Sequence, residues 1–368
     1  MLQNTDLSYQ HNLVRDELLQ TFDRLLTINQ FIGGEVVADF ESEFSSLIGK
    51  GFSVGVGNGT DALELAISSL RLKRGGKVIL PANSFAATAE AVVNSGLTPL
   101  FADVDESMNL DPSSVERLIS DEVAAIIFVP LYGNPTNADK IKELAHANLI
   151  FMIEDCAQAH FAELGETKAG DFGHISSFSF FPGKNFGALG DAGLVYSKNK
   201  NLIERVRLLA NHGRKDRDSH MEIGRNSRLD SIQAGFLRVK LKIADSIVQG
   251  RRRNARRLIS ELSGLQEVTL PLFDNQAKPV FHQFVIRTNE RDDLKDYLLS
   301  KGVEARVIYP KVIPLQEAFL PYQKGEWSQA EKFSSQILSI PVGEHLSSSE
   351  VDFISDSVKS FFLERRQK

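Results

Sequence analysis

Between residues 52 and 197 the chain alternates short apolar runs with stretches of helical periodicity. Two of the runs, 124–130 and 149–155, are apolar almost throughout, which indicates strands buried on both faces of a sheet. This alternation predicts an α/β fold with a mostly parallel sheet between helices. Strands are expected at 52–56, 77–80, 98–102, 124–130, 149–155, 175–180 and 193–197, with helices at 61–70, 86–94, 112–119 and 138–147.

The pattern changes near residue 229, where a long, mostly helical stretch begins and runs to residue 262. A smaller unit follows, with strands expected at 280–288 and 303–308 and helices at 292–300 and 349–363. We therefore predict a large domain at 1–245, including the N-terminal segment, and the long helix with a small α+β domain at 246–368. Five arginines between residues 251 and 257 favour a solvated helix face over a phosphate site.

Composition excludes several classes of protein. The net charge of −6 and the lack of a basic face argue against a nucleic-acid partner. Cys156 is the only cysteine, which excludes a disulfide scaffold and a cysteine-rich zinc site, and no metal is expected. No apolar window approaches the ~18 residues of a membrane span, and the first residues lack the apolar core of a signal peptide. We expect a cytoplasmic protein with no membrane partner.

A glycine-rich segment, Gly-Val-Gly-Asn-Gly-Thr at 55–60, lies between a predicted strand and a predicted helix. Such a turn can present the free N–H groups of the helix to an anion, and Thr60 adds a hydroxyl. A simple turn is the other interpretation. The segment contains no lysine and so is no P-loop, and its G-x-G-x-G spacing fails the dinucleotide pattern. An NAD-dependent oxidoreductase is therefore disfavoured.

Three further groups of polar residues follow predicted strands or precede the long helix. Asp155 ends an apolar run, where a carboxylate is either a helix cap or the counter-ion of a cationic ligand, and Gln158 and His160 follow closely. Lys184 lies between glycines after another strand, in surroundings that could desolvate its amine, as a nucleophilic lysine requires. Asn226 lies in a polar segment that could cap the long helix or donate to a ligand.

Taken in order along the chain, an anion cradle, a carboxylate and a lysine resemble the fold type I pyridoxal phosphate enzymes. The chain is most similar to the DegT/StrS-type nucleotide-sugar aminotransferases, and closest within them to the 3-keto-sugar members. The resemblance covers nearly the whole chain. It rests on the segments GVGNGTDALELA, PANSFAATAEAV, EDCAQAH, SFSFFPGKNFGALGDAG, NHGRK and GRNSRLDSIQAGF.

The resemblance implies a large domain with a mostly parallel mixed sheet and pyridoxal 5'-phosphate as the cofactor. Lys184 would form the internal aldimine and move the proton, Asp155 would pair with the pyridinium nitrogen, and Gln158 would hydrogen-bond the phenolic oxygen. Phe85 would stack on the ring. The phosphate would be held by Gly59, Thr60, Ser179 and Asn226, the last lent across the interface of a homodimer with shared active sites.

The implied reaction transfers an amino group from L-glutamate to a keto-sugar linked to a nucleoside diphosphate. Our specific expectation is conversion of a dTDP-3-keto-6-deoxyhexose to the 3-amino-3,6-dideoxyhexose, for O-antigen or other deoxyaminosugar biosynthesis. A 4-keto substrate and a non-catalytic regulator are the alternatives. A dehydratase is disfavoured, because those relatives replace the lysine with histidine. Substrate contacts are expected from His160, Phe181, His212, Arg214 and Tyr309.

Two departures bear on the sugar. Relatives often carry Tyr where Phe181 stands, and a His-Tyr-Pro stretch followed by another histidine where this chain reads Ile308-Tyr309-Pro310. Both changes remove polar donors. We therefore expect a more apolar substrate pocket, consistent with a deoxysugar.

Overall fold

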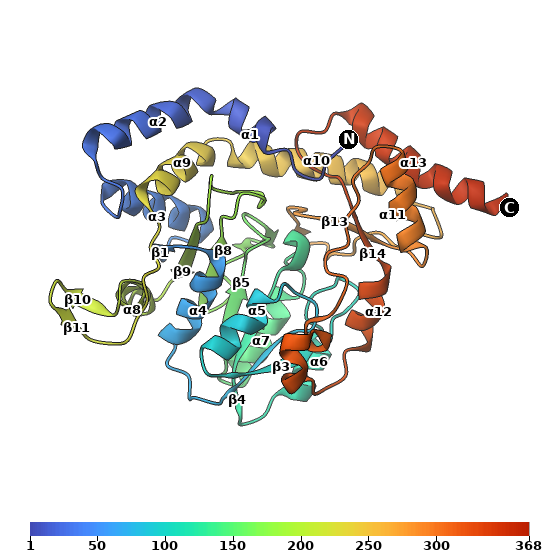
Figure 1. The fold of residues 1–368 in the computed structure, drawn as a ribbon. Helices are drawn as coiled ribbons and strands as arrows, with labels where there is room; N and C mark the ends of the chain where they lie inside the picture. The colour runs from blue at the N-terminus through green and yellow to red at the C-terminus, as the bar shows by residue number, and fades with distance from the viewer. Residues whose placement is uncertain (368) are drawn as a thin grey trace.

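The computed structural model describes residues 1–367 and has a seven-stranded mixed sheet at its centre (Figure 1). The strand order is β1-β9-β8-β5-β4-β2-β3, and within this sheet only β9 runs against the other six. The mixed α/β fold with a mostly parallel sheet is thus confirmed. The strands are β1 (Phe52–Val56), β2 (Lys77–Pro81), β3 (Thr98–Ala102), β4 (Val123–Phe128), β5 (Phe151–Asp155), β8 (Ile175–Ser179) and β9 (Gly193–Ser197).

Helices cover both faces of this sheet. Residues of α4 (Gly59–Ser69), α5 (Ala87–Asn94) and α8 (Lys200–Ala210) share one apolar core with the sheet. On the opposite face, α6 (Pro112–Leu118) and α7 (Ala138–Ala147) contribute to a second core. Burial on both faces explains why β4 and β5 are apolar along their lengths.

The sequence patterns did not predict the three N-terminal helices, α1 (Leu7–Leu13), α2 (Arg15–Ile28) and α3 (Glu35–Ile48). The predicted long helix is two helices, α9 (Ser231–Leu241) and α10 (Ala244–Leu262). At the break, the N–H groups of Lys242 and Ile243 bond the carbonyls three residues back, which tightens the turn and ends α9. Both α2 and α3 pack on α9.

The C-terminal unit is built on a two-stranded antiparallel sheet of β13 (Phe284–Arg287) and β14 (Ile337–Ile340). With α10, α11 (Arg291–Ser300) and α13 (Ser348–Arg366), it encloses a separate apolar core. The short helix α12 (Ser328–Gln336) instead packs its buried residues into the core of the large sheet. The domain boundary at 245/246 stays a prediction.

The prediction of a strand at 303–308 is wrong. Only Arg306 pairs with β14, through two hydrogen bonds with Ser339, and the chain then turns away from the small sheet. This turn brings Tyr309 to the large sheet. A strand that continued through residue 308 would keep Tyr309 in the small sheet instead. The predicted strand at 280–288 is shortened to β13, because residues before Phe284 pack against the segment after β8 instead.

The remaining elements are short. A three-stranded sheet joins β6 (Glu163–Leu164), β7 (Thr167–Lys168) and β12 (Ala277–Lys278), and a hairpin of β10 (Arg214–Asp216) and β11 (Ser219–His220) stands away from the central sheet beside α8 (Figure 1). Three 3-10 helices, η1 (Leu131–Gly133), η2 (Ile313–Leu315) and η3 (Glu317–Tyr322), lie in the connections. Within residues 1–367, no helix combines the length and apolarity needed to cross a membrane.

Candidate active site

A cavity of about 620 Å³ opens at the edge of the sheet where β1, β2, β4, β5 and β8 have their carboxyl ends. Parallel strands bring the loops that follow them to one edge, so residues far apart in sequence meet there. Nine of the predicted site residues line this cavity, namely Gly59, Thr60, Phe85, Asp155, Gln158, Ser179, Phe181, Lys184 and Tyr309.

The glycine-rich segment forms one wall of the cavity. Asn58 caps α4 by accepting a hydrogen bond from the N–H of Asp61, and the helix begins at Gly59. The first-turn N–H groups of Gly59 and Thr60 have no carbonyl partner within the helix, and the helix dipole adds partial positive charge there. A Cβ on Gly59 would lie 2.5 Å from Cβ of Ser179. A larger residue at position 59 would therefore push the start of α4 away from Ser179. The geometry suits an anion such as a phosphate.

Asp155 is one of three aspartates that line the cavity, beside Asp61 and Asp191. Its Oδ2 accepts a hydrogen bond of 2.9 Å from the hydroxyl of Thr88, and its Oδ1 accepts one of 3.3 Å from the N–H of Ala157. Burial raises the pKa of the Asp155 carboxyl, while these hydrogen bonds and Lys184 act in the opposite direction. A cationic partner would favour the ionised carboxylate further.

Lys184 lies in the turn that follows β8. Burial lowers the pKa of its amine, and the nearby Asp155 opposes this shift. Within residues 1–367, its Nζ has no hydrogen-bond partner in the protein. A desolvated amine without a partner is free to lose its proton and react with a carbonyl group.

Gln158 is oriented by hydrogen bonds at both ends of its amide. Its Oε1 accepts from the N–H of Tyr132 at 2.9 Å, which fixes the carbonyl end. Its Nε2 donates to the hydroxyl of Tyr309 at 3.2 Å. The amide therefore presents N–H groups, rather than oxygen, towards the cavity.

Aromatic rings border the mouth of the cavity. Phe85 is 58% exposed and its ring centroid lies 5.8 Å from that of Tyr309. Phe181, three residues before Lys184, is 56% exposed and also lines the cavity. Such exposed rings next to a cavity are available to cover a planar ligand.

Four predicted residues lie outside the cavity in this chain. His160 is completely buried among Phe178, Phe180 and Phe186, and burial lowers its pKa to about 3. It therefore has no surface to offer a substrate, which corrects the expectation of a sugar contact: it lies two residues beyond Gln158, where the chain has turned into the core.

The other three residues outside the cavity lie near the projecting hairpin. His212 and Arg214 lie at the base of β10, and Asn226 is exposed in the segment that follows β11. Asn226 bridges to Asn211 and lines no part of the cavity formed by its own chain.

Sequence patterns missed several contributors. Thr88 and Ser84, whose hydroxyls bond each other, support Asp155 from α5 and the loop before it. Their position in the segment PANSFAAT, one turn apart, was the available signal. Tyr132 acts on Gln158 through its backbone, for which no side-chain pattern exists.

Taken together, the cavity offers an anion cradle, a buried carboxylate, an amine and exposed aromatic rings. This set fits a planar ligand that carries a phosphate, a basic ring nitrogen and a carbonyl group. Within residues 1–367 no group of three or more histidine, cysteine or acidic side chains is arranged to hold a metal.

Comparison with known proteins gives matches along nearly the whole chain. The model of the DegT/DnrJ/EryC1/StrS aminotransferase family matches residues 12–359. The chain is 35% identical over 359 residues to the dTDP-3-amino-3,4,6-trideoxy-alpha-D-glucose transaminase of Streptomyces venezuelae, covering 97% of this chain and 95% of the relative. It is 37% identical over 365 residues to the UDP-N-acetyl-3-dehydro-alpha-D-glucosamine 3-aminotransferase of Acidithiobacillus ferrooxidans, covering 98% and 99%.

The fold matches a solved structure equally completely. The crystal structure of S. venezuelae DesV in complex with a ketimine intermediate superposes with a TM-score of 0.95, at 35% identity, over 98% of both chains. The two relatives named above are named for sugars on different nucleotides, dTDP for one and UDP for the other.

Proposed function

The chain belongs to the DegT/DnrJ/EryC1/StrS aminotransferase family, and on that premise we propose that it aminates C-3 of a dTDP-linked 3-keto-6-deoxyhexose, with L-glutamate as the amino donor. Pyridoxal phosphate as the cofactor and transamination of a nucleotide-linked sugar follow from the family and confirm those predictions. The sugar, its nucleotide and the donor are the proposed part.

Bound pyridoxal phosphate supplies an aldehyde that takes up the amino group and a ring that stores electrons released at the substrate carbon. In our proposal the first turn of α4 and Ser179 hold the phosphate, and Phe85 covers one face of the ring. Asp155 pairs with the ring nitrogen. The oriented amide of Gln158 donates to the phenolic oxygen, where an N–H is the group required.

Lys184 is the proposed catalytic residue. Its amine holds the cofactor between turnovers and carries a proton to and from the reacting carbon. Both tasks need a neutral amine for part of the time, and burial lowers the pKa of Lys184 in that direction. The observation that carries the proposal is that Lys184, Asp155 and the N-terminus of α4 line the same cavity.

Two observations support C-3 and a deoxysugar. Both relatives compared above are named for amination at position 3. Phe181 presents an apolar ring, without a hydroxyl, at the cavity. A site that lacks a polar donor loses no hydrogen bond when the sugar lacks the matching hydroxyl.

We also propose that two copies complete each other's sites. Asn226, His212 and Arg214 lie outside the cavity of their own chain. A two-fold dimer could bring these residues of one copy to the cavity of the other, as the family resemblance implies.

The test has two stages. Reconstituted protein should turn yellow, and glutamate should bleach that band, whereas Lys184→Ala protein should show neither change. The bleached protein is then offered matched 3-keto and 4-keto sugars on dTDP and on UDP, and product regiochemistry is read by NMR. Amination at C-4 alone would refute the positional proposal, and a Lys184→Ala protein with full turnover would refute the role of the lysine.

A further inference from the structure

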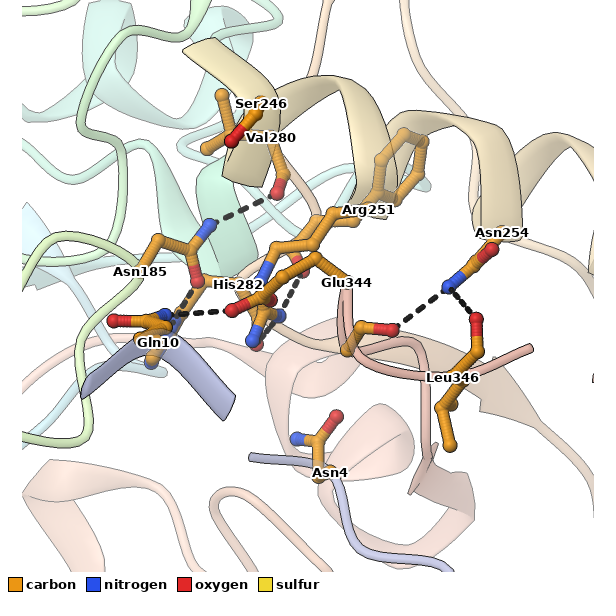
Figure 2. A network of polar contacts seen from close by, with 12 residues as sticks. Asn4, Gln10, Asn185, Ser246, Arg251, Asn254, Val280, His282, Glu344 and Leu346 are labelled. Atoms are coloured by element: carbon orange, nitrogen blue, oxygen red, sulfur yellow. Dashed lines mark hydrogen bonds and ion pairs between the residues drawn. The ribbon is translucent and has the colours of Figure 1, made fainter. Parts of the chain in front are cut away.

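The turn that carries Lys184 is held by the segment that precedes β13. Asn185, the next residue, is 3% exposed. Its Nδ2 donates to the carbonyl of Val280 at 2.9 Å, and its Oδ1 lies 3.1 Å from Nδ1 of His282 (Figure 2). Both ends of the Asn185 side-chain amide are therefore held, by Val280 and His282, which lie almost a hundred positions later in the chain.

These two contacts determine the protonation of His282. A carbonyl oxygen only accepts, so the amide nitrogen of Asn185 must face Val280 and its oxygen must face His282. His282 must then carry its proton on Nδ1 and donate it to Asn185. The ring is neutral, since burial and the nearby cations Lys184 and Arg251 hold the pKa of His282 well below its ordinary value.

A buried ion pair between Arg251 and Glu344 contacts the segment that holds Asn185. Arg251 of α10 donates through Nη1 to the carbonyls of Phe281 at 3.0 Å and His282 at 3.4 Å. Its Nε lies 2.9 Å from Oε2 of Glu344, and these two side chains are 1% and 4% exposed. Gln10 of α1 donates to the other oxygen of Glu344 at 2.6 Å (Figure 2).

Arg251 thus departs from the expected solvated helix face. An unpaired buried charge would be strongly destabilising, so the loss of either Arg251 or Glu344 should destabilise the fold. The carbonyls that Arg251 bonds belong to the residues that hold Asn185 or lie beside them. The ion pair therefore stiffens the support of the lysine turn.

The lysine turn is also restrained beyond Asn185, where the ring of Phe186 is buried against Phe180 and the N–H of Ala188 donates to the carbonyl of Phe180 at 2.7 Å. The turn belongs to no helix or strand, and the N–H of Lys184 donates to the carbonyl of Phe181 at 2.9 Å. On its far side, Lys240 of α9 donates to the carbonyl of Gly187 at 2.6 Å. The side-chain contacts of Asn185 lie closest in sequence to the reactive amine.

We propose that Asn185 and His282 are positioning residues for Lys184: the Nδ1–H of His282 and the carbonyl of Val280 lock the Asn185 amide, and this fixes the backbone that aims the lysine into the cavity. The proposal rests on the proposed role of Lys184. Neither residue lines the cavity, so each acts on the reaction through the lysine alone.

The test compares His282→Leu with His282→Asn. Leucine fills the space without a donor, whereas the asparagine amide can place an N–H close to the former Nδ1. For cofactor-free His282→Leu protein, we expect attachment of pyridoxal phosphate to Lys184, trapped with borohydride and located by mass spectrometry, to slow roughly 10–100-fold. His282→Asn should stay within about threefold of the unmodified protein, since it keeps the donor.

Pyridoxamine phosphate separates positioning from general damage, because it binds the same cavity without attaching to the lysine. Its affinity should change by less than about threefold in His282→Leu, since the cradle and Asp155 are untouched. Asn254→Leu is the matched structural control. Asn254 is 2% exposed in the same helix as Arg251, and its amide donates to the carbonyls of Gly343 and Leu346. That variant should lose stability with an unchanged attachment rate.

If His282→Leu does not fold, Asn185→Asp replaces it, since aspartate keeps the acceptor for His282 but cannot donate to Val280. An attachment rate equal to that of the unmodified protein in a folded variant would overturn the inference, as would equal losses for both cofactor forms. Retained attachment in a Lys184→Ala protein would instead overturn the proposed function.

Discussion

The hydroxyl of Thr88 donates a hydrogen bond of 2.9 Å to Oδ2 of Asp155, and so links the first turn of α5 to the end of β5. Thr88 is completely buried, and its hydroxyl also lies 2.9 Å from that of Ser84. A buried carboxylate needs such donors to remain ionised, because burial raises its pKa. Thr88 therefore stabilises the negative charge of Asp155, the carboxylate that we propose to pair with the ring nitrogen of the cofactor.

Replacing Thr88 by valine should weaken cofactor binding and slow the half-reaction with glutamate. A hydrogen bond to a charged group contributes ~1.5–3 kcal/mol, so each effect should be roughly tenfold or more. Thr88→Ser keeps the hydroxyl and should remain close to the unmodified protein. Titration of pyridoxamine phosphate and stopped-flow absorbance would measure the two quantities, and equal values for the valine and serine variants would contradict the role of Thr88.

Gly59→Ala should disrupt the phosphate cradle. The added Cβ would lie 2.5 Å from Cβ of Ser179, so the start of α4 must move away from Ser179. We expect cofactor affinity to fall at least about tenfold, since the N–H groups of the helix no longer converge on the phosphate. Gly183→Ala is the matched control, because its Cβ would make an ordinary contact, 3.5 Å from the Phe181 ring. Equal affinities in the two variants would refute the prediction.

Lys240 should make stability depend on pH. Burial lowers the pKa of its amine to about 8, whereas an unfolded lysine titrates near ~10.4. Between these values the unfolded chain binds a proton that the folded chain does not, so the free energy of unfolding rises with pH in this window. Lys240→Met should lack this rise, which amounts to at most about 3 kcal/mol.

Denaturant unfolding at about pH 7.5 and about pH 10.5 would measure the effect of Lys240 as a difference between the two proteins, which cancels other titrating groups. Lys242→Met is the control, because that side chain is 64% exposed and pairs at the surface with Glu17. A difference between unmodified and Lys240→Met protein that stays constant across this range would contradict the prediction.

Subunit sharing predicts complementation between two inactive variants. Lys184→Ala removes the amine, and Asn226→Leu removes the amide that we place in the partner's site. A mixed dimer has one site with both residues intact. Unfolding and refolding an equal mixture should therefore restore about a quarter of the unmodified activity. Mixed dimers seen by native mass spectrometry but without activity would rule out shared sites.

Much of the architecture could be read from local patterns. Every predicted strand of the large sheet forms, because runs such as 149–155 are apolar enough to need burial on both faces. The carboxyl ends of such strands share one edge, which brought Asp155, Lys184 and the segment at 55–60 to one cavity. The parallel arrangement of these strands is therefore sufficient to bring the residues that follow them together.

Other features depend on contacts between distant segments. Gln158 lines the cavity while His160 points into a cluster of phenylalanines, a difference that no pattern within two residues reveals. Tyr309 reaches the site only because the chain leaves the small sheet after Arg306. The arginine-rich sequence predicts a solvated face for Arg251, whereas in the fold this side chain is buried and pairs with Glu344.

The motifs that carry a glycine turn, a carboxylate and a lysine in this order indicated the chemistry, through their resemblance to the fold type I pyridoxal phosphate enzymes. How these groups are aimed and charged depends on packing. Hydrogen bonds such as that between Asn185 and His282 join segments almost a hundred residues apart, and desolvation of Lys184 arises only when the layers close around it. Local sequence does not determine these effects, because the orientation of a side chain and the polarity of its surroundings depend on which distant segments pack against it.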